Sequence, residues 1–325
     1  MSAALIIAIP SKGRLAENAA AFFARAGLDI RRDRGARNYR GGIAGVEGVE
    51  VAFLSASEIT SELAAGKVHL GVTGADLVRE RIPDAAGIVQ MVTPLGFGHA
   101  DVVVAVPRAW IDVAGIDDLV DVARSFRKTH GRRLRVATKY ANLTSRFFAA
   151  HGLTDYRIVE SLGATEGAPA AGSAEIIVDI TSTGSTLAAN DLKVPGGCVI
   201  LKSEANLVAS LDADWNRTAR GALAHILDHV AAEDRARAIY ELRADWKGGA
   251  PKDIAERLAA DTGASLLRDG GGSVVLHAPR AKLHRVSAGL KAAGATCVSV
   301  FTPGYVFEAD NPLLSRLIEA IGKSS

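Results

Sequence analysis

Short apolar runs, each followed by a small polar turn and then a helical segment, recur along this chain and constrain its fold more than any other feature. Examples are residues 4–9, 69–72, 134–138 and 176–180. Continuous apolar runs of this length are typical of strands buried on both faces of a parallel sheet. Because helical segments lie between the runs, the sequence predicts βαβ units and an α/β fold.

The distribution of these units predicts two lobes. At 325 residues the chain is too long for one typical domain. We expect a discontinuous first lobe over residues 1–103 and 187–213, and a second lobe over residues 104–186. The return to the first lobe is expected to use a strand at residues 198–201 and a short helix at residues 203–211. A cleft between two such lobes is the usual place for a ligand.

A different alternation begins at residue 214. A strongly amphipathic segment at residues 216–232 is followed by the order strand, helix, strand, strand, helix, strand up to residue 301. This order predicts a ferredoxin-like α+β domain over residues 214–325, with one more helix at residues 311–322. We expect such a domain to bind a small effector or a neighbouring subunit, because it carries no evident catalytic constellation.

Charge and cysteine content exclude several classes of protein. Lys and Arg number 38 against 36 acidic residues, so the formal charge of +2 does not favour nucleic-acid binding. Cys198 and Cys297 are far apart, which indicates a reducing compartment and not a disulfide-rich or metal-binding protein. The N-terminus lacks the basic start of a signal peptide, and no apolar stretch is long enough to span a membrane. A soluble, cytoplasmic protein is therefore expected.

One strand end carries the strongest candidate for an anion site. Asp179 lies at the carboxyl end of the run at residues 176–180, and a small polar turn centred on Gly184 leads to a helix near Leu187. Backbone N–H groups at such a junction can hold a phosphate, and a neighbouring acid suits sugar hydroxyls or a divalent cation. An ordinary capped strand–turn–helix junction is the alternative. Five hydroxyl groups add possible donors: Thr181, Ser182, Thr183, Ser185 and Thr186.

The first lobe has its own candidate residues at strand ends. Ser11, Lys12, Gly13 and Arg14 follow the first strand, where ligands of α/β folds bind. Gly74 and Asp76 follow another strand in the same way. An arginine-rich stretch is either a phosphate-contacting flap or a solvated hairpin. Its basic residues are Arg31, Arg32, Arg34, Arg37 and Arg40.

Taken together, these stretches resemble the ATP phosphoribosyltransferase family, the first enzymes of histidine biosynthesis. Residues 166–187 fit the family signature at every constrained position. Residues 9–15, 70–76, 95–98 and 135–143 resemble further family segments in the expected order. The constrained positions of the signature are Glu166, Gly172, Ala174, Ile177, Asp179, Ile180, Thr183, Gly184, Thr186 and Leu187.

The resemblance implies a fold and an activity. The expected fold is a two-lobed, periplasmic-binding-protein-like catalytic core followed by a ferredoxin-like, ACT-like regulatory domain, as in the long form of the family. The implied reaction transfers the phosphoribosyl group of phosphoribosyl pyrophosphate to N1 of ATP and releases pyrophosphate. Mg²⁺ is the implied cofactor, histidine the implied allosteric inhibitor, and a homohexamer built from dimers the implied assembly.

The resemblance also implies roles for particular residues. Asp179, Glu166 and Lys12 are expected to be catalytic, and Asp179 or Glu166 is expected to meet the metal, which is held mostly by substrate phosphates. Phosphoribosyl pyrophosphate is expected to contact Asp179, Thr181, Ser182, Thr183, Gly184, Ser185, Thr186 and Leu187. ATP is expected to contact Lys12, Gly13, Arg14, Gly74, Asp76, Tyr140, Asn142 and Leu143.

Two positions depart from the family pattern, and two other interpretations stay open. Ser55 stands where an Arg is common, and Ala141 where a Pro is usual. A non-catalytic, two-lobed binding module would share the architecture, because fold alone does not give function. A different phosphoribosyltransferase usually has two acids before the polar loop, whereas here Asp179 stands alone after Val178.

Overall fold

The computed structural model describes residues 4–33, 39–161, 163–249, 251–270 and 272–324. Arg34 and Arg37 of the arginine-rich stretch lie outside the described residues. The chain forms two compact units. Unit 1 comprises residues 1–22, 30–220 and 317–325, and unit 2 comprises residues 23–29 and 221–316.

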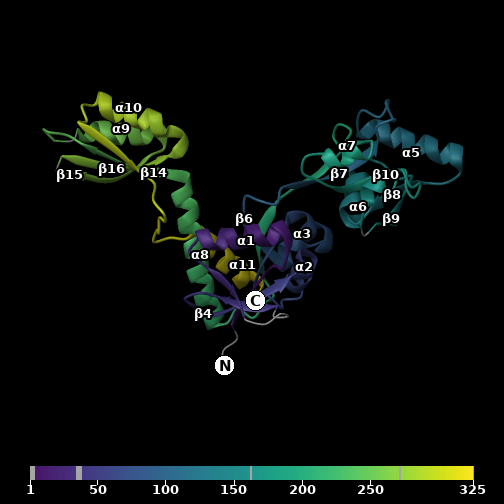
Figure 1. The fold of residues 1–325 in the computed structure, drawn as a ribbon, viewed down its shortest axis with the longest axis horizontal. Coiled ribbons are helices and arrows are strands. Elements are labelled where there is room, and N and C mark those ends of the chain that lie inside the picture. The colour runs from purple at the N-terminus through teal and green to yellow at the C-terminus, as the bar shows by residue number, and fades with distance from the viewer. Residues whose placement is uncertain (1–3, 34–38, 162, 250, 271, 325) are drawn as a thin grey trace. The chain divides into compact units, whose positions relative to one another are not determined.

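Seven strands form the first sheet of unit 1 (Figure 1). Its central strands are parallel, a hairpin lies at one edge, and an antiparallel pair lies at the other. In spatial order they are β2 (Ile30–Arg32), β3 (Arg40–Ile43), β4 (Val46–Leu54), β1 (Leu5–Pro10), β5 (Leu70–Gly74), β13 (Ala205–Ser210) and β6 (Val89–Pro94). The helices of this lobe are α1 (Gly13–Arg25), α2 (Ala56–Ala64), α3 (Ala75–Arg81) and α4 (Ala85–Ile88).

A second sheet of six strands forms the other lobe of unit 1. The strands are β7 (Ala100–Pro107), β8 (Leu134–Thr138), β9 (Tyr156–Glu160), β10 (Ile176–Thr181), β11 (Leu192–Lys193) and β12 (Val199–Ser203). The helices are α5 (Ile116–His130), α6 (Ala141–Ala150), the 3₁₀ turn η1 (Thr165–Gly167) and α7 (Ser185–Ala189).

Both faces of β10 are buried, as its apolar run predicts. Ile176 and Val178 belong to a core that also contains Tyr140, while Ile177 packs with Leu187 on the opposite face. Successive side chains of a strand point to opposite faces, so an unbroken apolar run suits a strand covered on both sides. Because β10, β8 and β9 run parallel, the turn after β10 lies at the carboxyl edge of the sheet, beside the ends of β8 and β9.

The chain leaves the second lobe later than the sequence predicts. Residues 187–213 were expected to return to the first lobe, but β11 and β12 both pair with β7, and only β13 joins the first sheet. The expected helix at residues 203–211 is wrong, because residues 205–210 form β13. All six residues of β13 are buried, and the strand pairs with neighbours on both sides. A strand that is buried on both faces shows no period-two pattern, so it is easily mistaken for a helical segment.

Unit 2 has the strand–helix order expected for a ferredoxin-like domain. Its sheet is antiparallel throughout, and helices α9 and α10 cover one face of it (Figure 1). The strands lie in the order β15 (Ser265–Gly270), β16 (Ser273–Pro279), β14 (Ile239–Asp245) and β17 (Cys297–Phe301). Its helical elements are most of α8 (Arg217–Ala238), α9 (Lys252–Thr262), η2 (Arg280–Lys282) and α10 (Leu283–Ala292). The last helix, α11 (Pro312–Ser324), begins in unit 2 and belongs to unit 1 from Leu317 onward.

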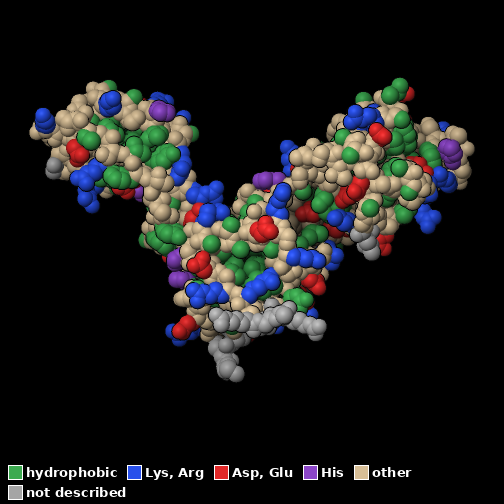
Figure 2. Space-filling model, in the orientation of Figure 1, with side chains coloured by type: hydrophobic (Ala, Val, Ile, Leu, Met, Phe, Trp, Pro, Cys, Tyr) green, Lys and Arg blue, Asp and Glu red, His purple; other side chains and the backbone are tan. Residues whose placement is uncertain are grey.

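The surface carries both signs of charge, as the near-equal numbers of basic and acidic residues in the sequence lead us to expect. On the face seen in Figure 2, basic and acidic side chains are interspersed. No helix in the described part of the chain is long and apolar enough to cross a bilayer. The two-lobed, periplasmic-binding-protein-like core and the ferredoxin-like C-terminal domain that the sequence predicts are confirmed.

Candidate active site

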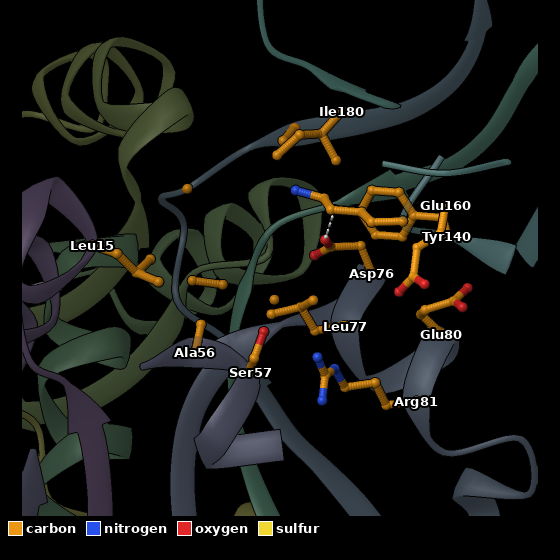
Figure 3. A pocket seen from close by; sticks show the side chains of 15 residues that line it. Leu15, Ala56, Ser57, Asp76, Leu77, Glu80, Arg81, Tyr140, Glu160 and Ile180 are labelled. Carbon is orange, nitrogen blue, oxygen red and sulfur yellow. Dashed lines mark hydrogen bonds between the residues drawn. The ribbon is translucent and has the colours of Figure 1, made fainter. Parts of the chain in front are cut away.

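A cavity of about 520 Å³ lies where the two lobes of unit 1 meet (Figure 3). Strands β1, β4 and β5 are parallel, and so are β8, β9 and β10. Each group therefore ends at one edge of its sheet, and the residues after these ends line the cavity. Ligands in open α/β sheets bind outside the carboxyl ends of the strands. The lining includes Gly74, Asp76, Glu80, Lys139, Tyr140, Glu160 and Ile180.

Tyr140 and Asp76 are hydrogen bonded to each other across the lobes. Tyr140 is 1% exposed, and its hydroxyl donates to Oδ2 of Asp76 at 2.8 Å (Figure 3). Ser203 donates its hydroxyl to Oδ1 of Asp76 at 2.8 Å and accepts the Asp76 N–H at 3.0 Å. Burial, and then the charge of Asp76, raises the pKa of Tyr140 far above its usual value. Tyr140 is therefore a permanent hydrogen-bond donor at any ordinary pH.

The glycine before α3 allows this arrangement. A Cβ atom on Gly74 would lie 2.2 Å from Oδ1 of Asp76, which is closer than atoms can approach. Any other residue at position 74 would displace the Asp76 carboxylate. The sequence pairing of Gly74 with Asp76 thus has a steric cause.

The backbone N–H groups of Asn142 and Leu143 donate hydrogen bonds to Glu80 of the first lobe. The N–H of Asn142 donates to Oε1 of Glu80 and the N–H of Leu143 donates to Oε2, both at 2.9 Å. The Asn142 side-chain amide also donates to the Glu80 carbonyl at 2.9 Å. These two predicted residues do not line the cavity; they follow the lining residue Tyr140, and their backbone donors are already paired.

Sequence reasoning missed several residues of the cavity, and it also missed Ser203, which bonds the lining residue Asp76. Glu80 lies four residues after Asp76 and so on the same face of α3, a spacing that could have indicated it. Lys139 precedes Tyr140, and its Nζ lies 5.2 Å from the Tyr140 ring centroid. Ser203 carries no local signal, because it reaches Asp76 from a strand more than 120 residues away in the chain.

The predicted phosphate loop follows β10. Gly184 has a φ of 74° and precedes α7, so the loop uses a conformation that glycine adopts without strain. Thr181 Oγ1 accepts the Gly184 N–H at 2.9 Å, and the Thr183 and Ser185 hydroxyls are 2.9 Å apart. The Ser182 hydroxyl donates to the His99 carbonyl at 2.9 Å. The loop is thus held in shape while Ser182, Thr183, Ser185 and Thr186 are exposed at its surface.

The remaining predicted residues are not among those that line the cavity. Asp179 is half-buried, and its Oδ1 accepts the N–H of Ile180 at 2.8 Å. Glu166 lies in η1, which packs against β10. At the start of α1, just before the lining residue Leu15, three exposed residues follow one another: Lys12, Gly13 and Arg14.

Comparison with known proteins decides what this arrangement belongs to. The family model for HisG, ATP phosphoribosyltransferase, matches residues 55–232. An ATP phosphoribosyltransferase of Bradyrhizobium sp. (strain ORS 278) is 56% identical over 98% of this chain and 98% of its own length. The chain belongs to the ATP phosphoribosyltransferase family. An ATP phosphoribosyltransferase of Nitrobacter winogradskyi is 55% identical, again over 98% of each chain.

A solved structure agrees with the family. The ATP phosphoribosyl transferase (HisG:HisZ) complex from Thermotoga maritima has a chain that is 25% identical, with a TM-score of 0.54. The match covers 70% of this chain and 95% of that one. The family resemblance stated from the sequence is therefore confirmed, and the chain is a transferase and not a non-catalytic binding module. The curated relatives also match over the C-terminal region, so the chain has the long form.

Proposed function

We propose that this chain transfers the phosphoribosyl group of phosphoribosyl pyrophosphate to N1 of ATP. The products are N1-(5-phosphoribosyl)-ATP and pyrophosphate, in the first step of L-histidine biosynthesis. The observation that carries the proposal is the cavity between the lobes, with a preformed hydroxyl-rich loop after β10 and the Asp76–Tyr140 pair opposite. The family match supports this choice of substrates.

The reaction requires electrostatic stabilisation more than base catalysis. Adenine N1 carries a free lone pair at neutral pH, so its activation needs no strong base. Positive charge develops on the ribose and negative charge on the departing pyrophosphate, and preorganised donors and acceptors lower that barrier. Each such group contributes about 3 kcal/mol in enzymes where it has been removed.

The loop after β10 is proposed to hold the 5-phosphate of phosphoribosyl pyrophosphate. Residues 181–187 supply backbone N–H groups and hydroxyls, and the bonds within the loop reduce the ordering needed on binding. Asp179 and Glu166 are proposed to face the ribose hydroxyls. Lys12 and Arg14 are proposed to contact phosphates from the first lobe, because both are exposed beside the lining residue Leu15.

The Asp76 side of the cavity is proposed to receive ATP. Gly74 and Asp76 form its floor, and Tyr140 borders the adenine. The N–H groups of Asn142 and Leu143 already donate to Glu80. These two residues would therefore border the adenine without donating a backbone hydrogen bond to it. Gly13 would let the chain approach the triphosphate closely at the start of α1.

Mg²⁺ fits these residues as a substrate-bound ion. Among the described residues, no group of three or more His, Cys, Asp or Glu side chains could hold a metal by themselves. Mg²⁺ commonly uses one or two carboxylates and takes its other ligands from phosphates and water. Asp179 or Glu166 would supply the carboxylate, and the bound ion would neutralise charge on the leaving pyrophosphate.

Regulation, assembly and location complete the proposal. Histidine is proposed to inhibit through unit 2, and the chain is proposed to form a homohexamer in the cytoplasm. Light scattering on the purified protein should give six times the chain mass of 33.9 kDa. A stable monomer at micromolar concentration would contradict the hexamer.

A direct assay tests the activity. Purified protein mixed with ATP, phosphoribosyl pyrophosphate and Mg²⁺ should produce the ultraviolet absorbance of an N1-ribosylated adenine. If the parent binds both substrates and makes no product, the proposed reaction is wrong.

Asp179→Asn should lower kcat/KM about 100-fold while the protein stays folded, because the change removes the charge beside the ribose. Unchanged turnover in Asp179→Asn would remove that residue from the site.

A further inference from the structure

Helix α3 presents two buried acids to the second lobe. Asp76 and Glu80 are four residues apart and each is 8% exposed. Residues four apart lie on one face of a helix, and here both side chains reach the start of α6. Figure 3 shows Asp76 and Glu80 on the same side of the cavity, with Tyr140 beside them.

Glu80, a residue of the first lobe, caps helix α6 of the second lobe. The first N–H groups of any helix lack partners within the helix and need an acceptor. The residue at the N-cap position of α6 is Tyr140, whose side chain makes no capping hydrogen bond. The two carboxylate oxygens of Glu80 accept the N–H groups of Asn142 and Leu143 instead. Negative charge at a helix N-terminus is also favoured by the helix dipole.

Further bonds tie the same two helices together. The side-chain amide of Asn142 donates to the Glu80 carbonyl at 2.9 Å. Arg146, one turn further along α6, donates to the carbonyl of Arg79. The end of α3 and the start of α6 therefore form one hydrogen-bonded joint, in which the Glu80 carboxylate is the central acceptor.

We propose that Glu80 is a positioning residue that presents Lys139 and Tyr140 to the nucleotide. The inference rests on the proposed function, because it assigns ATP to this cavity. The Tyr140–Asp76 bond joins two side chains that line the cavity, so a nucleotide can compete for both partners. The Glu80 carboxylate bonds to the backbone of α6. These bonds therefore hold the helix in place whether or not a nucleotide displaces the Tyr140–Asp76 bond.

The test is a comparison of Glu80→Gln with the parent enzyme in full-length protein. Glutamine keeps the size of the side chain but offers one acceptor oxygen and sets an NH₂ group against a backbone N–H. We expect the KM for ATP to rise about tenfold or more. The KM for phosphoribosyl pyrophosphate should change less than about twofold, because its loop follows β10, and kcat should change little.

Asp118→Asn is the matched control. Asp118 Oδ2 accepts the N–H groups of Ala114 at 2.9 Å and of Gly115 at 2.8 Å, so it also caps a helix through two backbone donors. It caps α5 and does not line the cavity. Both N–H groups bond the same oxygen, so the asparagine carbonyl oxygen can accept them, and we expect this variant to stay folded and to keep the parental KM for ATP.

Arg146→Gln is a second, milder variant, for the case in which Glu80→Gln does not fold. Its exposed side chain contributes one bond to the joint, so the KM for ATP should rise about threefold. The proposal is overturned if Glu80→Gln keeps the parental KM for ATP, if both KM values rise together, or if Asp118→Asn has the same effect. If Glu80→Gln does not fold, a parental KM for ATP in Arg146→Gln overturns it. Failure of the proposed function is a separate result, because then the parent itself forms no product.

Discussion

Glu175 joins the beginnings of two strands in the second lobe through charged hydrogen bonds. Its carboxylate accepts hydrogen bonds from the backbone N–H of Arg135 at 2.7 Å, from Nη2 of Arg135 at 2.7 Å and from Nη2 of Arg132 at 3.0 Å. Burial raises the pKa of Glu175, but the hydrogen bonds from Arg135 and Arg132 outweigh it and lower the pKa to about 2. These residues lie at the end of the strands opposite the cavity, so their role is to stabilise the lobe.

The Glu175 cluster predicts a pH dependence of stability. A carboxyl whose pKa falls from 4.5 to about 2 on folding contributes stability that is present above pH 4.5 and lost as the pH falls toward 2. The full shift corresponds to at most about 3 kcal/mol, and solvent screening of the guanidinium groups reduces it to about 1–2 kcal/mol. Glu175→Gln should therefore unfold more easily than the parent at pH 7 in denaturant titrations. The difference should shrink between pH 4.5 and 2, and a difference independent of pH would contradict the assignment.

At the scale of elements, helix α2 begins with a capping box at one of the positions that departs from the family. The Ser55 hydroxyl accepts the N–H of Glu58 at 3.3 Å, and the Glu58 carboxylate accepts the N–H of Ser55 at 2.8 Å. The next two residues, Ala56 and Ser57, line the cavity. Ser55 thus orients the start of a helix at the cavity wall. Ala141, the other departure, is the first residue of α6, and the two N–H groups that follow it donate to Glu80.

The capping box predicts the effect of one substitution. Ser55→Ala removes the acceptor for the Glu58 N–H and should destabilise the protein by about 1 kcal/mol. For a unit of this size, that is a fall in Tm of about 2–4 °C, measured by differential scanning calorimetry. Ser61→Ala is the control, because the Ser61 hydroxyl donates to the Ser57 carbonyl within α2 and accepts from Arg81, and so takes no part in the capping box. Equal effects of the two changes would mean that the capping box contributes nothing.

At the scale of the whole molecule, the segment that ends α1 belongs to unit 2. Tyr305 donates its hydroxyl to the Arg25 carbonyl, and Nδ1–H of His229 donates to the Ala26 carbonyl, each at 2.9 Å. Arg25 also pairs with Glu233 at 3.3 Å. Conversely, residues 317–325 belong to unit 1. Cutting the chain near residue 220 would therefore damage both units, so regulation by histidine is better tested in the full chain.

Hydrogen exchange on the full-length protein tests the proposed site of histidine. Adding histidine should slow amide exchange within residues 239–301, the sheet and helices of unit 2, because a bound ligand stabilises the segment that holds it. Alanine at the same concentration is the control and should leave the exchange rates unchanged. Slowing confined to the cavity residues of unit 1 would show that histidine competes with substrate and would contradict an effector site in unit 2.

Much of the fold and part of the site could be predicted from local patterns. The apolar run at residues 176–180 and the glycine-centred turn after it predict a strand and a loop, and both form as expected. The same local signal predicts Gly74 and Asp76 at the end of β5. These features depend on a few neighbouring residues, because strand burial and tight turns are short-range properties.

The sequence by itself determined the alternation of strands and helices, the family and the hydroxyl-rich loop. Only the tertiary structure decided that β11 and β12 stay with β7, that Ser203 bonds Asp76, and that Glu80 caps a helix of the other lobe. The physical reason is that an unpaired strand edge or a buried carboxylate needs a partner, and nearby sequence does not specify which partner it finds. That choice depends on which distant groups the packed lobes bring within hydrogen-bond distance.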